Sequence, residues 1–397
     1  MKFRLLLLIS LLIPVLVIGC TEEKAPTKTP TPVPANVLKI GVLIPKTGKF
    51  QTSGVVMENS ARLAKKHIEE EMGIKVELVF ADCGDSAEKT KSAFLELSDS
   101  VLAVVGAYSS TQAIAAADTA METKTPYIVS VASAGIIEQK VNEGNRYVFR
   151  NAYNTTYWGE LAVEFLKLSK AEGYYFQGFQ PLSTFNQGML NVIKKYKEPV
   201  AVSYYNPSVD PKDVQKKAVE AANAVGEHDV LILGDPGRLS ISYLKEYRQN
   251  GGKGIVYSIG GVLALPQTLK NLESAEYTAF QSAALDKIKV TEYTEKYFED
   301  YRKEFGEDAN NYAGVLTYDA ILILAKAFEK SGDDKEMLIK VLEEGEFTGA
   351  CGVYKFNENH QALWGSEKLK GKISEWVDGR AVVLYPEEYR ESDVVWP

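Results

Sequence analysis

The chain has 397 residues, of which 45% are hydrophobic and 25% are charged, as in an ordinary globular protein. Its 53 acidic residues outnumber the 45 basic ones, and the net charge of −8 argues against a nucleic-acid partner, since such proteins usually present a basic face. Three cysteines and three histidines leave little material for a metal site, and the length fits two domains better than one.

The first twenty residues, MKFRLLLLISLLIPVLVIGC, have the pattern of a secretory signal. Lys2 and Arg4 form a positive start, and an apolar stretch follows. The ending Gly19-Cys20 resembles the processing site of lipoproteins, so we expect residues 1–19 to be removed and Cys20 to be lipidated. The alternative is an uncleaved anchor helix, for which the apolar stretch is short. Either interpretation predicts export and attachment to the outer face of the cell membrane.

Residues 20–37 are predicted to form a tether between the lipid and the folded part. Pro26, Pro30, Pro32 and Pro34 stand among threonines, and such sequence favours extended, semi-rigid chain that does not pack into a core.

From residue 38 onwards, short apolar runs alternate with amphipathic segments, which predicts an α/β fold with a doubly wound parallel sheet. In the first part of the chain, strands are expected at 38–44, 74–80, 101–105, 127–131 and 147–149.

A second alternation follows and predicts a second lobe on the same plan. Its strands are expected at 174–179, 199–205, 229–233 and 254–258, with helices at 157–169, 187–196, 211–225, 238–250 and 265–271. Two long amphipathic segments come next, at 290–306 and 311–331, and the chain ends with short strands at 352–356, 373–376 and 381–384.

The stretch 103–135 is predicted to place two loops of small residues, 106–110 and 132–135, at one edge of the first sheet. Both loops follow parallel strands, and the carboxyl edge of an open α/β sheet is where ligands bind. Ser109 and Ser110 fall at the start of the next helix, where hydroxyls and backbone N–H groups can hold a carboxylate. Simple helix capping is the alternative interpretation.

The sequence contains no G-x-S-x-G, H-E-x-x-H or phosphate-loop motif. Its histidines, His67, His228 and His360, are scattered along the chain. We therefore predict a protein that is not an enzyme and that uses neither a cofactor nor a metal.

A collinear series of segments resembles the branched-chain amino-acid type (leucine/isoleucine/valine-binding) of substrate-binding lipoprotein that serves ABC transporters. The segments are IGVLIPKTGKF, VVGAYSSTQA, PYIVSVASA, YVFRN, YAGVLTYDA, CGVYKFNENHQ and ISEWVDGRAVVLYP. The resemblance implies a type I periplasmic-binding-protein fold, with two Rossmann-like lobes joined by a three-crossover hinge. One lobe would comprise 38–152 and 285–361, and the other 153–284 and 362–397.

The resemblance also implies a small ligand in the cleft between the lobes. Its carboxylate would be held by the two small-residue loops, namely by Ser109, Ser110, Ala132, Ser133 and Ala134. Aromatic side chains would lie against the rest of the ligand, namely Phe50, Tyr108 and Phe185. Ala134 stands where the family has a threonine, and Ser133 could substitute for it.

The loop around Gly260 is expected to contact the ligand, and Gly260 is predicted as a ligand-binding residue. The acidic residue that receives the ligand's ammonium in this family has no clear match in this loop. Asp235 could supply that charge from another strand, or it could be an ordinary loop residue. Without it, an amide, urea-like or aromatic acid ligand would fit better than an amino acid, because a buried ammonium without a partner costs several kcal/mol.

The function implied by the resemblance is capture of a small amino acid of the branched-chain type and its delivery to the membrane subunits of an ABC permease. A ligand-sensing ectodomain on the same fold is the alternative. With Cys20 assigned to lipidation, Cys83 and Cys351 are left as either a disulfide or two buried thiols.

Overall fold

The computed structural model describes residues 37–269, 272 and 275–397. The predicted signal at 1–19, the lipidation site Cys20 and the tether up to residue 36 therefore lie outside the described residues. Within the described part of the chain, no helix combines the length and the apolar character that a membrane span requires.

The first sheet consists of five parallel strands in the order β2-β1-β3-β4-β5. The strands are β1 (Leu38–Ile44), β2 (Val76–Asp82), β3 (Ala103–Gly106), β4 (Tyr127–Val129) and β5 (Val148–Arg150). They are connected by α1 (Gln51–Glu71), α2 (Ala87–Ser98), α3 (Ser110–Thr123) and α4 (Ile136–Asn142).

Both faces of this sheet are buried, because successive side chains of a strand point to opposite sides. In β1, Ile40 and Val42 belong to the core cluster that contains the apolar face of α1, whereas Leu43 belongs to the cluster formed with α2 and α3. The near-continuous apolar run of β1 follows from this two-sided burial.

The second sheet has seven strands in the order β14-β13-β10-β9-β8-β6-β7. The strands are β6 (Gly173–Phe179), β7 (Ala201–Tyr205), β8 (Asp229–Gly234), β9 (Ile255–Ser258), β10 (Thr278–Ser282), β13 (Lys372–Val377) and β14 (Arg380–Tyr385). The first five are parallel, and the last two form an antiparallel hairpin added to the β10 edge.

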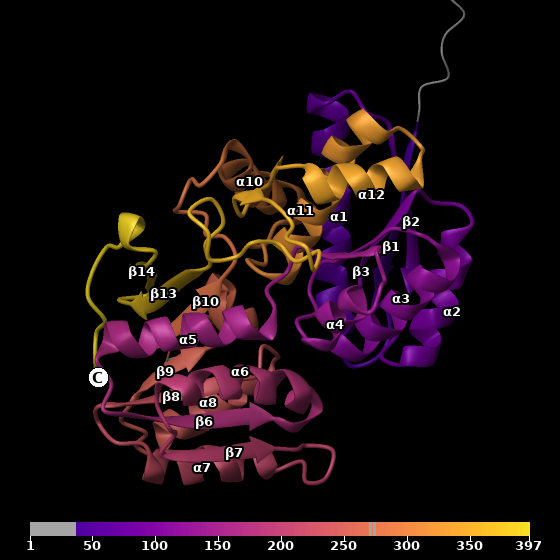
Figure 1. Ribbon diagram of the computed structural model, residues 1–397. Coiled ribbons are helices and arrows are strands. Elements are labelled where there is room, and N and C mark those ends of the chain that lie inside the picture. The colour runs from indigo at the N-terminus through magenta and orange to yellow at the C-terminus, as the bar shows by residue number, and fades with distance from the viewer. Residues whose placement is uncertain (1–36, 270–271, 273–274) are drawn as a thin grey trace, which may run out of the picture. The chain divides into compact units, whose positions relative to one another are not determined.

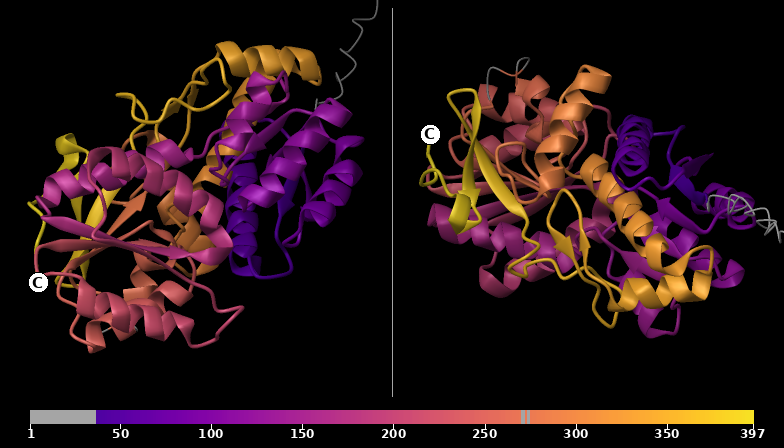
Figure 2. Two further views of the ribbon diagram at one scale, coloured as in Figure 1. Left: turned by 60° about the horizontal axis from the view of Figure 1, so that its bottom comes forward. Right: turned by 90° about the horizontal axis from the view of Figure 1, so that it is seen from above.

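Helices cover this sheet on both sides (Figure 2, left). They are α5 (Thr155–Ser169), α6 (Ser183–Tyr196), α7 (Asp213–Ala224), α8 (Leu239–Gln249) and the short α9 (Pro266–Leu269), with 3-10 turns at Gln180–Leu182 and Gly261–Ala264. Tyr174 and Phe176 pack towards α5, whereas Tyr175 packs towards α7 and α8.

The chain passes between the two sheets three times. It leaves the first sheet after β5, and it returns after β10 to form α10 (Glu292–Phe305), α11 (Ala313–Ser331) and α12 (Lys335–Glu344), of which α10 and α11 pack against α1 (Figure 1). After the short pair β11 (Phe347–Thr348) and β12 (Val353–Tyr354), it crosses again to β13. The predicted two-lobed α/β fold is therefore confirmed, whereas the exact lobe limits stay a prediction.

Two buried cations tie these crossing segments together. The Arg150 guanidinium donates to Gln361 Oε1 at 2.5 Å, to the Ala134 carbonyl at 3.0 Å, and to the Glu138 carboxylate. The Lys372 ammonium donates to the Ala283 carbonyl at 2.8 Å and to the Cys351 carbonyl at 2.9 Å. Because these hydrogen bonds join segments that lie far apart in the sequence, they hold the crossing segments next to one another.

Most predicted elements are present, and the differences have local causes. The strand β10 was not predicted because its sequence, TAFQS, is buried yet half polar and shows no apolar run. The helix α12 was not predicted either; it begins after Asp334, whose side chain accepts the Glu336 and Met337 amides as an N-cap. The helix α6 begins at Ser183, not at 187, so Phe185 lies in a helix and not in a loop.

Candidate functional site

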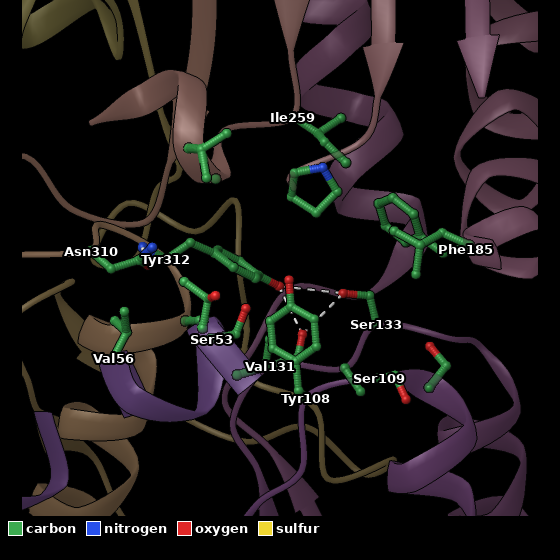
Figure 3. A pocket seen from close by; sticks show the side chains of 18 of the residues that line it. Ser53, Val56, Tyr108, Ser109, Val131, Ser133, Phe185, Ile259, Asn310 and Tyr312 are labelled. Carbon is green, nitrogen blue, oxygen red and sulfur yellow. Dashed lines mark hydrogen bonds between the residues drawn. The ribbon is translucent and has the colours of Figure 1, made fainter. Parts of the chain in front are cut away.

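A cavity of about 130 Å³, here called the first chamber, lies between loops and helix starts of the two lobes (Figure 3). From the elements around the first sheet it is lined by Thr52, Ser53, Val56, Tyr108, Ser109, Ser110, Val131, Ala132, Ser133, Asn310, Tyr312 and Ala313. From the elements around the second sheet it is lined by Trp158, Leu182, Phe185, Pro236, Ile259, Gly261, Val262 and Leu265. None of the residues in this lining is charged.

The serines of the first loop both cap a helix and line the chamber. Ser109 is the N-cap of α3; its Oγ accepts from the Gln112 amide at 3.4 Å, and its own amide donates to Gln112 Oε1 at 2.8 Å. This reciprocal pair uses the Ser109 N–H, which is therefore not free for a ligand. The amides of Ser110 and Thr111, in the first turn, have no acceptor within the helix.

Ser133 joins residues from three separate segments. Its Oγ accepts from Trp158 Nε1 at 2.8 Å. The same Oγ lies 3.3 Å from the Tyr312 hydroxyl, which donates to the Val131 carbonyl at 3.0 Å (Figure 3). Burial raises the pKa of Tyr312, so its hydroxyl keeps its proton and remains a donor. Ser133 thus positions two aromatic side chains of the chamber wall.

Trp158 and Tyr312 were not predicted as site residues. Trp158 lies in a predicted helix, and nothing in a helical pattern shows which residue of its first turn faces a cleft. Tyr312 opens the segment YAGVLTYDA, which carried the family resemblance without indicating a contact. The ring of Trp158 lies 4.7 Å from that of Tyr312 and 5.5 Å from that of Phe185, between centroids, so the three form one aromatic wall.

A second chamber of about 380 Å³ adjoins the first. The two linings share Thr52, Ser53, Tyr108, Leu182, Pro236 and Val262. The remaining residues of the second chamber are Lys49, Phe50, Phe179, Pro181, Pro207, Ser208, Asp235, Gly237, Arg238 and Leu239. Phe50 thus lines this chamber and not the first, with its ring centroid 5.0 Å from that of Tyr108.

Asp235, predicted to receive an ammonium, lies in the wall of the second chamber and is 1% exposed. Its carboxylate accepts from the Tyr205 hydroxyl and, at 2.7 Å, from the Gly237 amide. Burial raises the pKa of Asp235, because the charged form loses hydration. Whether it also meets a ligand stays a prediction.

Two other predicted site residues, Ala134 and Gly260, line neither chamber. The Ala134 carbonyl accepts from Arg150 and supports the loop from behind. Gly260 has φ +86°, and a Cβ there would lie 2.4 Å from the Gln281 carbonyl oxygen, so its glycine serves a tight turn.

The two cysteines do not pair. Both are free and buried: Cys83 lies in the core cluster between the first sheet, α2 and α3, and Cys351 lies in the separate cluster around α11. The structure therefore has two buried thiols in place of the disulfide that the sequence left open.

Comparison with known proteins shows to which family the chain belongs. A model of the family described as periplasmic binding protein matches residues 37–365. The chain belongs to the periplasmic binding protein family. This confirms the family resemblance seen in the sequence, and the family is one of substrate-binding proteins.

Individual relatives are distant but cover nearly the whole chain. The chain is 24% identical to Leu/Ile/Val-binding protein homolog 8 of Brucella suis biovar 1 over 402 residues, which cover 94% of this chain and 96% of that protein. Among solved structures, a leucine-binding protein from Thermotoga maritima has a TM-score of 0.71 at 21% identity, covering 87% of this chain and 97% of its own.

Two further structures were solved with different ligands. A branched-chain amino acid transporter substrate-binding protein from Streptococcus pneumoniae, in complex with isoleucine, has a TM-score of 0.72 at 19% identity and covers 91% of this chain and 100% of its own. A solute-binding protein from R. palustris, in complex with benzoate, has a TM-score of 0.74 at 17% identity and covers 88% and 95%. At such identities these likenesses show a shared fold.

Proposed function

We propose that this protein is the extracytoplasmic solute-binding component of an ABC importer and that it closes on a small solute with an apolar body. The observation that supports this most directly is the first chamber, because both lobes contribute to its wall. A solute in such a cavity contacts both lobes only when they are closed, so binding favours the closed state.

The first ligand class is a small amino acid of the branched-chain type, which the leucine-, isoleucine- and valine-binding relatives favour. Its side chain would pack against Val56, Val131 and Ile259, and its carboxylate would take hydrogen bonds from the hydroxyls of Ser109 and Ser110.

One observation favours a second ligand class. Among the described residues, no acidic side chain lines the first chamber, so the ammonium of an amino acid would have no ionic partner there. A buried charge without a partner is costly. An amide, a urea-like molecule or an aromatic acid has no such requirement.

Anchoring through Cys20 and docking on permease subunits complete the proposal. For the anchor, we expect a Cys20→Ser variant to leave the membrane fraction while keeping its solute affinity, because the residues that line the two chambers all lie at or after Lys49. A variant that stays with the membrane would refute lipidation at Cys20.

The function is tested by identifying the solute. The protein would be purified without added ligand and denatured, and the released small molecules identified by mass spectrometry. Isothermal titration against the twenty amino acids and benzoate would follow. We expect at least one compound to bind with one site per chain. The proposal fails if nothing is released and no compound gives heat.

A further inference from the structure

The two chambers share part of their lining, although their side chains differ in charge. Six residues contribute to both linings, among them Tyr108 from the first lobe and Pro236 from the second. The two chambers are therefore adjacent, and a solute that occupied both would lie against these shared residues. The first chamber has no charged side chain, whereas three charged residues, Lys49, Asp235 and Arg238, line the second.

The two cations of the second chamber are not neutralised by the protein. Lys49 and Arg238 are exposed, and neither has an ion-pair partner among the described residues. The nearby Lys46, in contrast, pairs with Glu58 at 3.1 Å. The Lys49 ammonium lies 5.1 Å from the centroid of the Phe50 ring, which itself lines the chamber. Two cations therefore line the same cavity of a protein whose net charge is −8.

Asp235 does not serve as their counter-ion. Its carboxylate is buried and accepts from Tyr205 and Gly237, on its own side of the cleft. No ion pair joins it to Lys49 or Arg238 in the described part of the chain. The accessible charge of the second chamber is therefore positive.

Lys49 and Arg238 belong to different lobes. Lys49 lies in the loop between β1 and α1, and Arg238 immediately precedes α8. When the lobes close without an anion, two like charges line one cavity, which costs free energy. An anion between them changes this repulsion into attraction to both lobes.

We propose that the second chamber is a binding subsite for a carboxylate and that the solute is an extended organic acid. Its apolar body fills the first chamber, and its carboxylate reaches Lys49 and Arg238. This inference rests on the proposed function, which it deepens by naming the class of solute and a second subsite.

The experiment compares acids with their amides as chain length increases. The probes are benzoate, 3-phenylpropionate and 4-phenylbutyrate, together with the corresponding amides, titrated into the wild-type protein. We expect the longest acid to bind at least about tenfold more tightly than its amide, and benzoate to show no such preference, since its carboxylate stays in the first chamber. Added salt should weaken the binding of the longest acid but not the binding of its amide, because salt screens the attraction between charges.

A matched pair of double variants tests the residues. Lys49→Gln combined with Arg238→Gln should abolish the acid preference of the longest probe, so that the acid and its amide bind with the same affinity. Lys91→Gln combined with Lys253→Gln removes the same charge from one exposed lysine of each lobe, paired with Glu122 and Glu227, and should change neither.

The other outcomes would overturn the inference. Equal affinity for acid and amide, or a preference that survives Lys49→Gln with Arg238→Gln, means that the second chamber is not a carboxylate subsite. Tight leucine binding that is lost in Asp235→Asn would also overturn it, while upholding the proposed function with an amino acid ligand. If no probe and none of the twenty amino acids binds, both fail together.

Discussion

Ser133 connects the two lobes through hydrogen bonds of a single hydroxyl. It lies in the loop after β4, whereas Trp158 belongs to α5 and Tyr312 directly precedes α11. These aromatic side chains are large and carry one polar atom each, so burying them requires a partner for that atom. The hydroxyl of Ser133 accepts from Trp158 and lies within hydrogen-bond distance of the Tyr312 hydroxyl, which also donates to the Val131 carbonyl. This explains a small polar residue at the centre of an apolar wall.

We expect Ser133→Ala to lower the free energy of unfolding by about 1–3 kcal/mol, because the Trp158 N–H would stay buried without an acceptor. Solute affinity should fall as well, since the aromatic wall loses its fixed position. Urea unfolding and titration measure the two effects. Ser130→Ala is the control: Ser130 is also buried, but among the described residues its hydroxyl has a hydrogen-bond partner only in Thr317, at 3.2 Å. Equal losses in both variants, with unchanged affinity, would contradict this role.

Because Glu375 is a buried carboxyl group, we expect the free energy of unfolding to depend on pH. This residue of β13 is fully buried; its Oε2 accepts from the Val395 amide at 2.9 Å, and its Oε1 has no hydrogen-bond partner in the described part of the chain. Burial raises the pKa of Glu375 to about 7. Between the ordinary value of 4.5 and about 7, the folded state keeps a proton that the unfolded state has released. Stability contributed by this group therefore falls as the pH rises through that window.

We expect Glu375→Gln, which keeps an acceptor for Val395 but cannot ionise, to remove this fall. Relative to the variant, the wild type should lose on the order of 2 kcal/mol between about pH 5 and pH 8. Urea unfolding at both pH values measures the difference. Glu367→Gln, at an exposed position, should follow the wild type. A variant with the same pH slope as the wild type would disprove the argument.

At the scale of elements, the entry into α1 shapes the cleft. The loop after β1 carries Lys49 and Phe50, and α1 begins at Gln51. Gly54, in the first turn, lies so close to the preceding loop that an added Cβ would be 2.0 Å from the Pro45 carbonyl oxygen. A glycine is required here because the helix start and the strand end are in direct backbone contact.

We expect Gly54→Ala to push this loop outward, to destabilise the fold by about 1–3 kcal/mol, and to weaken solute binding. Gly135→Ala is the matched control, since its backbone is ordinary and nothing lies within 4 Å of an added Cβ. Thermal unfolding and titration of both variants give the comparison. If Gly54→Ala unfolds at the same temperature as the wild type and binds the solute equally well, Gly54 does not constrain this loop.

At the scale of the whole molecule, Lys372 links the second and third crossings through the Ala283 and Cys351 carbonyls. Burial lowers the pKa of Lys372 to about 8, yet the two carbonyls keep the side chain in place as a hydrogen-bond donor. The Lys372 ammonium thus links the chain segments around Ala283 and Cys351, which have no shared helix or strand.

We expect Lys372→Met to lower the free energy of unfolding by about 2 kcal/mol, because two buried carbonyls lose their donor while the loss is partly offset by removal of a desolvated charge. Lys370→Met, two residues earlier, breaks only a partly exposed ion pair with Glu388 and should cost less than about 1 kcal/mol. Urea unfolding of the pair decides. A Lys372→Met variant as stable as Lys370→Met would show that the junction does not depend on this ammonium.

The alternation of strands and helices is visible in the amino-acid sequence alone, and it predicts the fold class. Apolar runs such as 38–44 reveal strands because burial on both faces demands them, and Ser109 reveals a helix start because capping is a local interaction. The half-polar strand β10 was not predicted, because its burial depends on the neighbouring strands and not on its own residues.

The composition of the site, in contrast, depends on contacts between segments that lie far apart in the sequence. Ser133 meets Tyr312 across 179 residues of sequence, and Asp235 meets Tyr205 across 30, and no local pattern encodes such contacts. The lining of the cleft likewise separates Asp235, in the second chamber, from Ser109 and Ser133, in the first. The physical reason is that helix and strand patterns depend on near neighbours, whereas the wall of a cleft is set by how two lobes meet.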